Sequence, residues 1–274
     1  MTSFPPRVYI VGAQKCGTTS LARALENNPE GCLSEPKEPN FFSGNYTRGL
    51  EWYRECFSDL DKVLVDASTT YTMCPLSERA LAFKSGRQKQ VGVPGRIKSA
   101  RPDALLIYII RDPVKRLYSN YWHNRKFAYE DLPLMDAVER DPQYRHLSEY
   151  YGQLSLYLEH FDKSQILVLK FEDFVKNQQH YVNVCERFIG VNETASTQEK
   201  NENKSREYSP LGQLLMNLRL TRKLGHLVPG KIKQAIRNRL SREIPTLERA
   251  DEAKLRAFFK EDQTMLHENF GIRY

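Results

Sequence analysis

The feature that most constrains this 274-residue chain is a glycine-spaced turn, Gly12-Ala13-Gln14-Lys15-Cys16-Gly17-Thr18-Thr19, directly after the apolar run Arg7–Val11. The apolar run predicts a buried strand, and the pattern from Thr18 to Leu25 predicts a helix. A turn at such a junction points backbone N–H groups and the positive end of the helix dipole at one place. The sequence therefore predicts an anion site, with Lys15 supplying a charge and Thr18 and Thr19 supplying hydroxyl groups.

Alternating strand and helix patterns extend over the first 191 residues. Further strands are predicted at Lys62–Asp66, Ala104–Ile110 and Ile166–Lys170. Helices are predicted at Pro113–Lys126, at Gly152–Phe161 and from an Asp173 cap to Phe188. This alternation predicts an α/β core with helices on both faces of a parallel sheet, and ligands bind beyond the carboxyl ends of such strands. Residues 192–274 are predicted to form a mostly helical C-terminal part of the same domain, with helices at Leu211–Leu224 and Leu247–His267 and no further strands.

The turn differs from the phosphate loop of NTPases in one respect. That loop reads G-x-x-x-x-G-K-[ST], with the lysine directly after the second glycine. Here the glycines keep this spacing, but Lys15 precedes Gly17 and Thr18 stands in the lysine's place. Asp66, at the end of the second predicted strand, mimics the aspartate that holds Mg²⁺ in ATP enzymes. An ATP-dependent small-molecule kinase is therefore one alternative, which the position of Lys15 opposes.

The pattern G-x-Q-K-x-G-T-T resembles the 5′-phosphosulfate loop of sulfotransferases that use 3′-phosphoadenylyl sulfate (PAPS). It is most similar to the branch that contains heparan sulfate N- and O-sulfotransferases and their bacterial relatives. The resemblance implies a P-loop NTPase-like three-layer fold, PAPS as co-substrate, adenosine 3′,5′-bisphosphate (PAP) as product and no metal. It also implies contacts to the 5′-phosphosulfate from Lys15, Cys16, Gly17, Thr18 and Thr19.

A second motif, Arg111-Asp112-Pro113-Val114-Lys115-Arg116-Leu117-Tyr118-Ser119, resembles the 3′-phosphate segment of the same family. The resemblance makes Arg111 and Ser119 the 3′-phosphate ligands, and an arginine makes bidentate, charge-assisted bonds to phosphate oxygens. The family's late cofactor-covering loop is matched only in part, at Lys204, Ser205 and Arg206. These three residues either cover the nucleotide or begin a basic surface.

The segment Ser34–Phe42 resembles the acceptor side of the heparan-type branch. There, a glutamate four positions before the second of two phenylalanines acts as the base, and Glu38 matches it. Glu35 is the neighbouring alternative. His123 aligns with a histidine near the acceptor in the N-sulfotransferase branch, and an imidazole can assist proton removal at neutral pH.

The chain departs from the family pattern after the second strand. Many eukaryotic O-sulfotransferases of this branch carry a catalytic E-K pair there, and this chain has Asp66-Ala67.

Charge points to an anionic partner without naming it. The net charge is +7, and Lys204–Arg242 contains ten basic residues and one acid. Such a surface attracts nucleic acid, acidic membranes or anionic glycans. A non-catalytic nucleic-acid binder is a second alternative, although the segment has no recognisable nucleic-acid motif. Ser85–Gly95, with three glycines, a proline and no acid, is predicted to be a mobile basic insertion.

Localisation is predicted from what the sequence lacks. It has no apolar run of eighteen residues, and the first predicted strand follows Met1 too closely for a secretory signal. Five scattered cysteines without a C-x-x-C pair are typical of reduced thiols. These observations predict a cytoplasmic enzyme without a membrane span.

Together with the resemblance, the sequence favours a PAPS-dependent sulfotransferase acting on a hydroxyl or amine of a carbohydrate or glycoconjugate, with Glu38 as base and no nucleic-acid partner.

Overall fold

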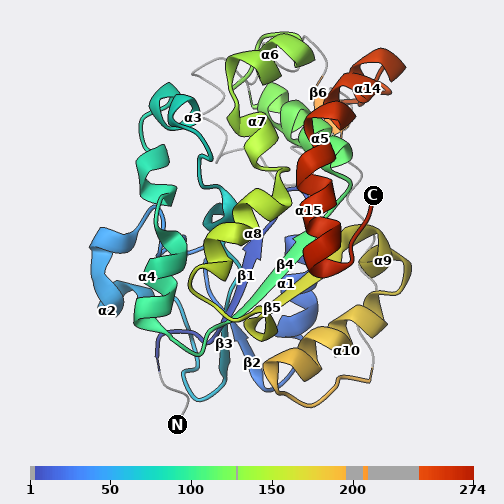
Figure 1. Cartoon of the computed structure of the whole chain (residues 1–274). Helices are drawn as coiled ribbons and strands as arrows, with labels where there is room; N and C mark the ends of the chain where they lie inside the picture. The colour runs from blue at the N-terminus through green and yellow to red at the C-terminus, as the bar shows by residue number, and fades with distance from the viewer. Residues whose placement is uncertain (1–3, 128, 196–205, 209–240) are drawn as a thin grey trace.

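The core of the molecule is a five-stranded, wholly parallel sheet with the strand order β2-β3-β1-β4-β5 (Figure 1). The computed structural model describes residues 4–127, 129–195, 206–208 and 241–274. The strands of this sheet are β1 (Val8–Gly12), β2 (Gly31–Leu33), β3 (Val63–Asp66), β4 (Leu105–Ile110) and β5 (Ile166–Lys170). The predicted α/β fold with a central parallel sheet is confirmed.

The strands β1 and β4 lie at the centre because they are apolar on both faces. Every residue of β1 and of β4 is buried, which is typical of strands covered by helices on both sides. Val8 pairs with Leu105 on one side and with Val65 on the other. This register brings the carboxyl ends of β1 and β4 to the same edge of the sheet.

Helices cover both faces of the sheet. Figure 1 shows α8 (Tyr150–Leu158) and α15 (Lys260–Phe270) in front of the strands and α1 (Thr18–Glu26) behind them. α15 and α4 (Val93–Ala100) pack against α8, whereas α10 (Gln178–Ile189) packs against α1. The resulting three layers share one large apolar cluster that contains the buried strand residues.

A second, smaller apolar cluster joins α5 to the end of the chain. It contains residues of α5 (Pro113–Lys126), α6 (Leu134–Arg140), α7 (Gln143–His146) and α14 (Arg249–Phe258). The C-terminal helix α14 therefore packs beside α5 (Figure 1). The remaining helical elements are α2 (Gly49–Arg54), α3 (Glu78–Phe83), α9 (Phe171–Lys176) and the 3₁₀ turns η1 (Tyr46–Arg48), η2 (Thr69–Thr72), η3 (Arg87–Gln90) and η4 (Lys163–Gln165).

Three predicted elements differ from the structure. The helix predicted from Asp173 to Phe188 is two helices, α9 and α10, because the Asn177 side chain accepts a hydrogen bond from the His180 amide and caps a new helix. The predicted helix Leu247–His267 is likewise divided, at Phe259 between α14 and α15. Strands do not stop after Val191, since β6 (Arg206–Tyr208) and β7 (Ser241–Glu243) form an antiparallel pair. The predicted helix Leu211–Leu224 lies outside the described residues.

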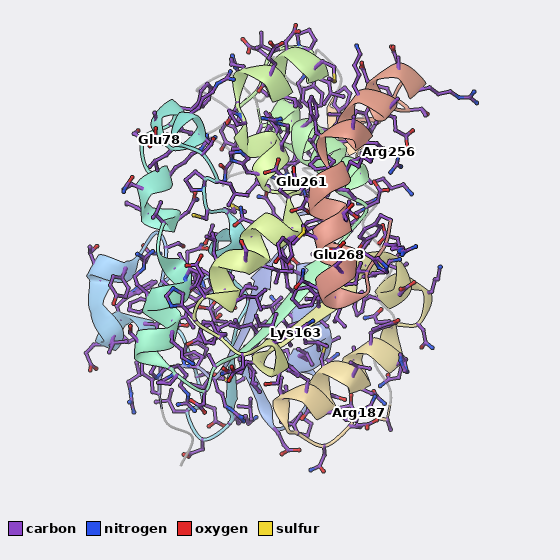
Figure 2. All side chains as sticks on the ribbon, viewed as in Figure 1. Glu78, Lys163, Arg187, Arg256, Glu261 and Glu268 are labelled. Atoms are coloured by element: carbon purple, nitrogen blue, oxygen red, sulfur yellow. The ribbon has the colours of Figure 1, made fainter. Side chains whose placement is uncertain are left out.

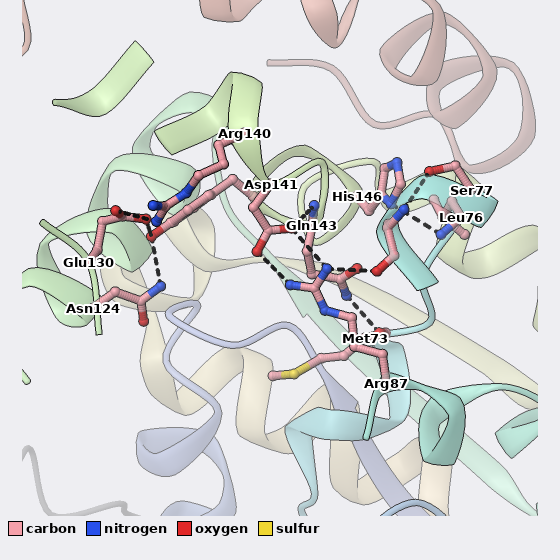
Figure 3. Close-up of polar contacts among 12 residues, drawn as sticks. Met73, Leu76, Ser77, Arg87, Asn124, Glu130, Arg140, Asp141, Gln143 and His146 are labelled. Atoms are coloured by element: carbon pink, nitrogen blue, oxygen red, sulfur yellow. Dashed lines mark hydrogen bonds and ion pairs between the residues drawn. The ribbon is translucent and has the colours of Figure 1, made fainter. Parts of the chain in front are cut away.

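The basic segment Ser85–Gly95 is not the mobile insertion that its glycines predict. It contains η3 and the first turn of α4. Arg87 is buried, and its guanidinium donates to both carboxylate oxygens of Asp141, at 2.8 and 2.5 Å, and to the Ala80 carbonyl (Figure 3). Such a bidentate, largely buried pair anchors the segment.

Over the described ranges, none of the helices combines the length and the apolar character that crossing a bilayer requires. All five cysteines are buried and have free thiols.

Candidate functional site

The loop between β1 and α1 has a backbone that its glycines permit. Gly17 has φ 81°, in the left-handed region that favours glycine, and Lys15 has φ 71°. The Ala13 amide donates to the Ile109 carbonyl at 2.7 Å, which fixes the start of the loop to β4. The first amides of α1 have no partner within their own helix, so the end of this helix is suited to an anion.

Lys15 lies among other cations. Burial lowers the pKa of Lys15, and the charges of Lys126, Arg111 and Arg116 lower it further. His123, on α5, belongs to the same cluster: burial together with Lys15 and Lys126 lowers its pKa to about 4. The imidazole is therefore neutral near pH 7. The two sequence motifs follow β1 and β4, which are paired in parallel, so they meet at the carboxyl ends of these strands, and an anion placed there would relieve the mutual repulsion of these cations.

Two aromatic residues that the sequence did not single out connect the motifs. The Arg111 guanidinium carbon lies 5.1 Å from the centre of the Phe171 ring, and a Cβ atom on Gly17 would lie 2.6 Å from the same ring. The Tyr150 hydroxyl accepts a hydrogen bond from the Arg111 amide at 3.4 Å and lies 3.9 Å from Cys16 Sγ. Phe171 directly follows β5, so its place at the end of a predicted strand was the signal that could have identified it.

Arg116 adds a buried positive charge that acts on Lys15. Its guanidinium is fully buried and donates to the Ser148 hydroxyl and to the Tyr144 carbonyl. One terminal nitrogen has no hydrogen-bond partner among the described residues. Burial lowers the pKa of Arg116, but an arginine stays protonated in proteins. The Arg111–Ser119 motif therefore contributes a second arginine to the positive potential of the site.

The predicted acceptor residues lie beside the loop hydroxyl groups. Glu38 Oε1 lies 3.0 Å from Lys37 Nζ, and Glu38 Oε2 accepts a hydrogen bond from Thr69 Oγ1 at 3.1 Å. The Lys37 ammonium in turn donates to Thr18 Oγ1 and Thr19 Oγ1. Glu35, by contrast, is exposed. The structure therefore brings Glu38, and not Glu35, into contact with groups that touch the loop.

Asp66 does not have the surroundings of a magnesium ligand. Its carboxylate is fully buried and accepts four hydrogen bonds: Oδ2 from the Tyr53 and Tyr71 hydroxyls, at 2.6 and 2.7 Å, and Oδ1 from the Ser68 amide and hydroxyl. Burial raises the pKa of Asp66 to about 6. Four donors occupy the roughly four lone-pair positions of a carboxylate. The interpretation of Asp66 as resembling a metal-holding aspartate, which rested on its position in the sequence, is therefore wrong.

Asp112 has a structural role at the start of α5. Its Oδ1 caps the helix by accepting a hydrogen bond from the Lys115 amide at 2.9 Å, and its Oδ2 pairs with Arg256 of α14 at 3.1 Å. Figure 2 labels Arg256 on this helix. The pair ties the C-terminal helices to the strand end that carries Arg111. The ion pair of Asp112 is thus with Arg256 of the C-terminal helix.

The remaining predicted nucleotide contacts are only partly described. Ser119 lies on α5, partly exposed and two turns beyond Arg111. Lys204 and Ser205 lie outside the described residues, as does most of the basic segment Lys204–Arg242. Arg206 begins β6, which packs against α5. Within the described ranges there is no group of three or more histidine, cysteine or acidic side chains arranged to hold a metal ion.

A parallel sheet with an anion-suited loop after its first strand defines the class of P-loop-like nucleotide-binding folds. The family described as the sulfotransferase domain matches residues 5–214, and the chain belongs to this family. A solved sulfotransferase from Alicyclobacillus acidocaldarius has the same fold, with a TM-score of 0.67 and 21% sequence identity over 99% of this chain and 98% of that one.

Curated relatives show which enzymes the chain resembles in sequence. It is 28% identical over 206 residues to the bifunctional heparan sulfate N-deacetylase/N-sulfotransferase 2 of Bos taurus, covering 68% of this chain and 22% of that protein. It is 26% identical over 196 residues to the human heparan sulfate glucosamine 3-O-sulfotransferase 3B1, covering 68% of this chain and 46% of that protein. The aligned part therefore spans less than half of the length of either relative.

Proposed function

We propose that the protein transfers the sulfuryl group of PAPS to a hydroxyl or amine of a carbohydrate or glycoconjugate. The observation that carries the proposal is that the β1–α1 loop and the Arg111 segment lie together although they are about a hundred residues apart in the sequence: the Ala13 amide donates to the Ile109 carbonyl, and the Tyr150 hydroxyl lies beside both Cys16 and the Arg111 amide. Membership of the sulfotransferase family supports the reaction class. Relatives named for heparan sulfate support a sugar acceptor.

In the proposed mechanism, Lys15 and the loop groups of Gly17, Thr18 and Thr19 hold the 5′-phosphosulfate, and Arg111 and Ser119 hold the 3′-phosphate. Glu38 accepts the proton of the acceptor as its oxygen or nitrogen forms a bond to sulfur. The bond between sulfur and the phosphate oxygen breaks, and PAP leaves with the electron pair of this bond. Lys15 stabilises the negative charge that develops on that oxygen. His123, neutral because its pKa is about 4, takes the role of an acceptor-side hydrogen-bonding group.

Thermal unfolding with three ligand types tests this proposal against its alternatives. Stabilisation by PAP in the presence of a chelator supports the sulfotransferase, because ligand binding to the folded state raises the melting temperature. Stabilisation only by Mg·ATP supports the kinase, and stabilisation only by an oligonucleotide supports the nucleic-acid binder. Transfer of ³⁵S-sulfate from PAPS to a panel of N-desulfated and O-desulfated glycosaminoglycans then identifies the acceptor class. A protein that neither binds PAP nor labels any acceptor would refute the proposal.

A further inference from the structure

Lys37 occupies a position that neither sequence motif explains. Its ammonium group donates to Thr19 Oγ1 at 3.3 Å and to Thr18 Oγ1 at 3.4 Å, and lies 3.0 Å from Glu38 Oε1. Only 13% of the side chain is exposed, whereas surface lysines extend into water. One cation therefore contacts both the loop and the predicted base.

The backbone of Lys37 is held from two sides, which gives the side chain a defined origin. Its carbonyl accepts hydrogen bonds from Ser34 Oγ at 3.1 Å and from the Ala67 amide at 3.4 Å. These donors follow β2 and β3, two neighbouring strands of the sheet. The lysine therefore projects from a fixed point at the sheet edge.

The charge of Lys37 separates two groups that repel each other during the proposed reaction. A donor held at Thr18 and Thr19 is anionic, and Glu38 must be an anion to accept a proton. Two negative charges within a few ångströms of each other oppose close approach, and a cation between them removes the opposition. The two oxygens of Glu38 are each held by one donor, Lys37 or Thr69, so the same contact also fixes the direction of the carboxylate.

We propose that Lys37 is a positioning residue for sulfuryl transfer, which holds the Glu38 carboxylate toward the end of the loop that carries Thr18 and Thr19. This inference rests on the proposed function. Lys37 keeps its proton throughout, and Glu38 alone accepts the proton of the acceptor. Because Lys37 acts through Glu38, its contribution should appear in kcat and should vanish when Glu38 is no longer a base.

The experiment is a double-mutant cycle in the full chain with Lys37→Met, Glu38→Gln and the double variant. We expect Lys37→Met to lower kcat at least about thirtyfold, somewhat less than the about 10²–10⁴-fold contribution of the proton-accepting group itself, and to leave the Kd for PAP within about threefold. In the Glu38→Gln background, Lys37→Met should lower kcat less than about threefold, because the effects of coupled residues are not additive. Lys37→Arg keeps the charge and should recover most of the rate.

The control is Lys62→Met. It removes a lysine that lies away from the loop and whose ammonium group is 4.0 Å from Asp59 Oδ2, so kcat should be unchanged. A Lys37→Met enzyme with normal kcat would overturn the inference, as would equal losses in the two Glu38 backgrounds. Loss of PAP binding in Lys37→Met would instead make Lys37 a nucleotide ligand and would also overturn it. The proposed function fails separately, if the unmodified protein neither binds PAP nor transfers sulfate.

Discussion

Replacing Gly17 with alanine tests whether the loop and Phe171 form one packed unit. The substitution has two costs. A non-glycine residue at φ 81° costs about 1–2 kcal/mol for the left-handed backbone alone. The new Cβ would also lie 2.6 and 2.7 Å from two atoms of the Phe171 ring, and relieving such an overlap costs about 1–3 kcal/mol more.

The matched control is Gly190→Ala. Gly190 ends α10 with the same φ of 81°, and a Cβ there would meet nothing within 4 Å. We expect Gly190→Ala to lower the free energy of unfolding by about 1–2 kcal/mol and Gly17→Ala by about 2–5 kcal/mol. Urea unfolding followed by tryptophan fluorescence measures both values. Gly17→Ala should also weaken PAP binding, because the displaced ring contacts Arg111.

A double variant separates the ring overlap from the backbone cost. In Gly17→Ala/Phe171→Ala the overlap is absent, so the alanine at position 17 should cost only as much as Gly190→Ala. Equal destabilisation by the two single glycine substitutions would refute the packing argument. The argument would also be refuted if the double variant lost as much free energy of unfolding as the two single variants lose together.

The remaining predictions concern the charged groups of the proposed site. Lys15→Ala should lower kcat about a hundredfold or more, the scale of one lost transition-state donor, with a much smaller loss in PAP affinity. Since the pKa of Lys15 is lowered from its ordinary 10.5, kcat/KM for PAPS should fall as pH rises through a midpoint below 10.5, and Lys15→Arg should move that midpoint upward. The protein should prefer PAP to 5′-AMP by at least about 1.5 kcal/mol, and Arg111→Ala should remove most of this preference in calorimetry. Glu38→Gln should lower kcat by about 10²–10⁴ while Glu35→Gln stays active. If Glu35→Gln were inactive and Glu38→Gln active, the alignment of the motif would be shifted. If both glutamate variants were active and His123→Ala inactive, the histidine would be the base.

The long buried elements could be predicted from the sequence because they depend on local apolar runs. β3, β4 and β5 each lie within a predicted run, and β1 extends one residue beyond its run, to Gly12. β2 was missed because Gly31–Leu33 has only three residues and one glycine, too short for a periodic signal. The break between α9 and α10 depends on Asn177, whose capping role the apolar pattern of the surrounding helix obscured.

The contacts of the site depend on tertiary structure, and the sequence shows them less well. Lys15 and Arg111 could be selected because each belongs to a motif with its own chemistry. Phe171 and Tyr150 acquire their roles only when β5 and α8 are placed beside β4. Lys37 stands next to the predicted base in the sequence, but its hydroxyl partners are eighteen and nineteen residues earlier. No local sequence pattern indicates a contact between residues so far apart in the sequence.

The distribution of charge distinguishes the proposed reaction from the kinase alternative. A kinase of this fold needs a carboxylate at the end of a neighbouring strand with open lone pairs for a metal ion. Asp66 stands at that strand end, but Tyr53, Tyr71 and Ser68 donate to both of its oxygens. Negative charge on a bound nucleotide must then be balanced by side-chain cations and backbone amides. Lys15 and its neighbouring arginines supply that balance at the loop itself, as transfer of a singly charged sulfuryl group without a metal would require.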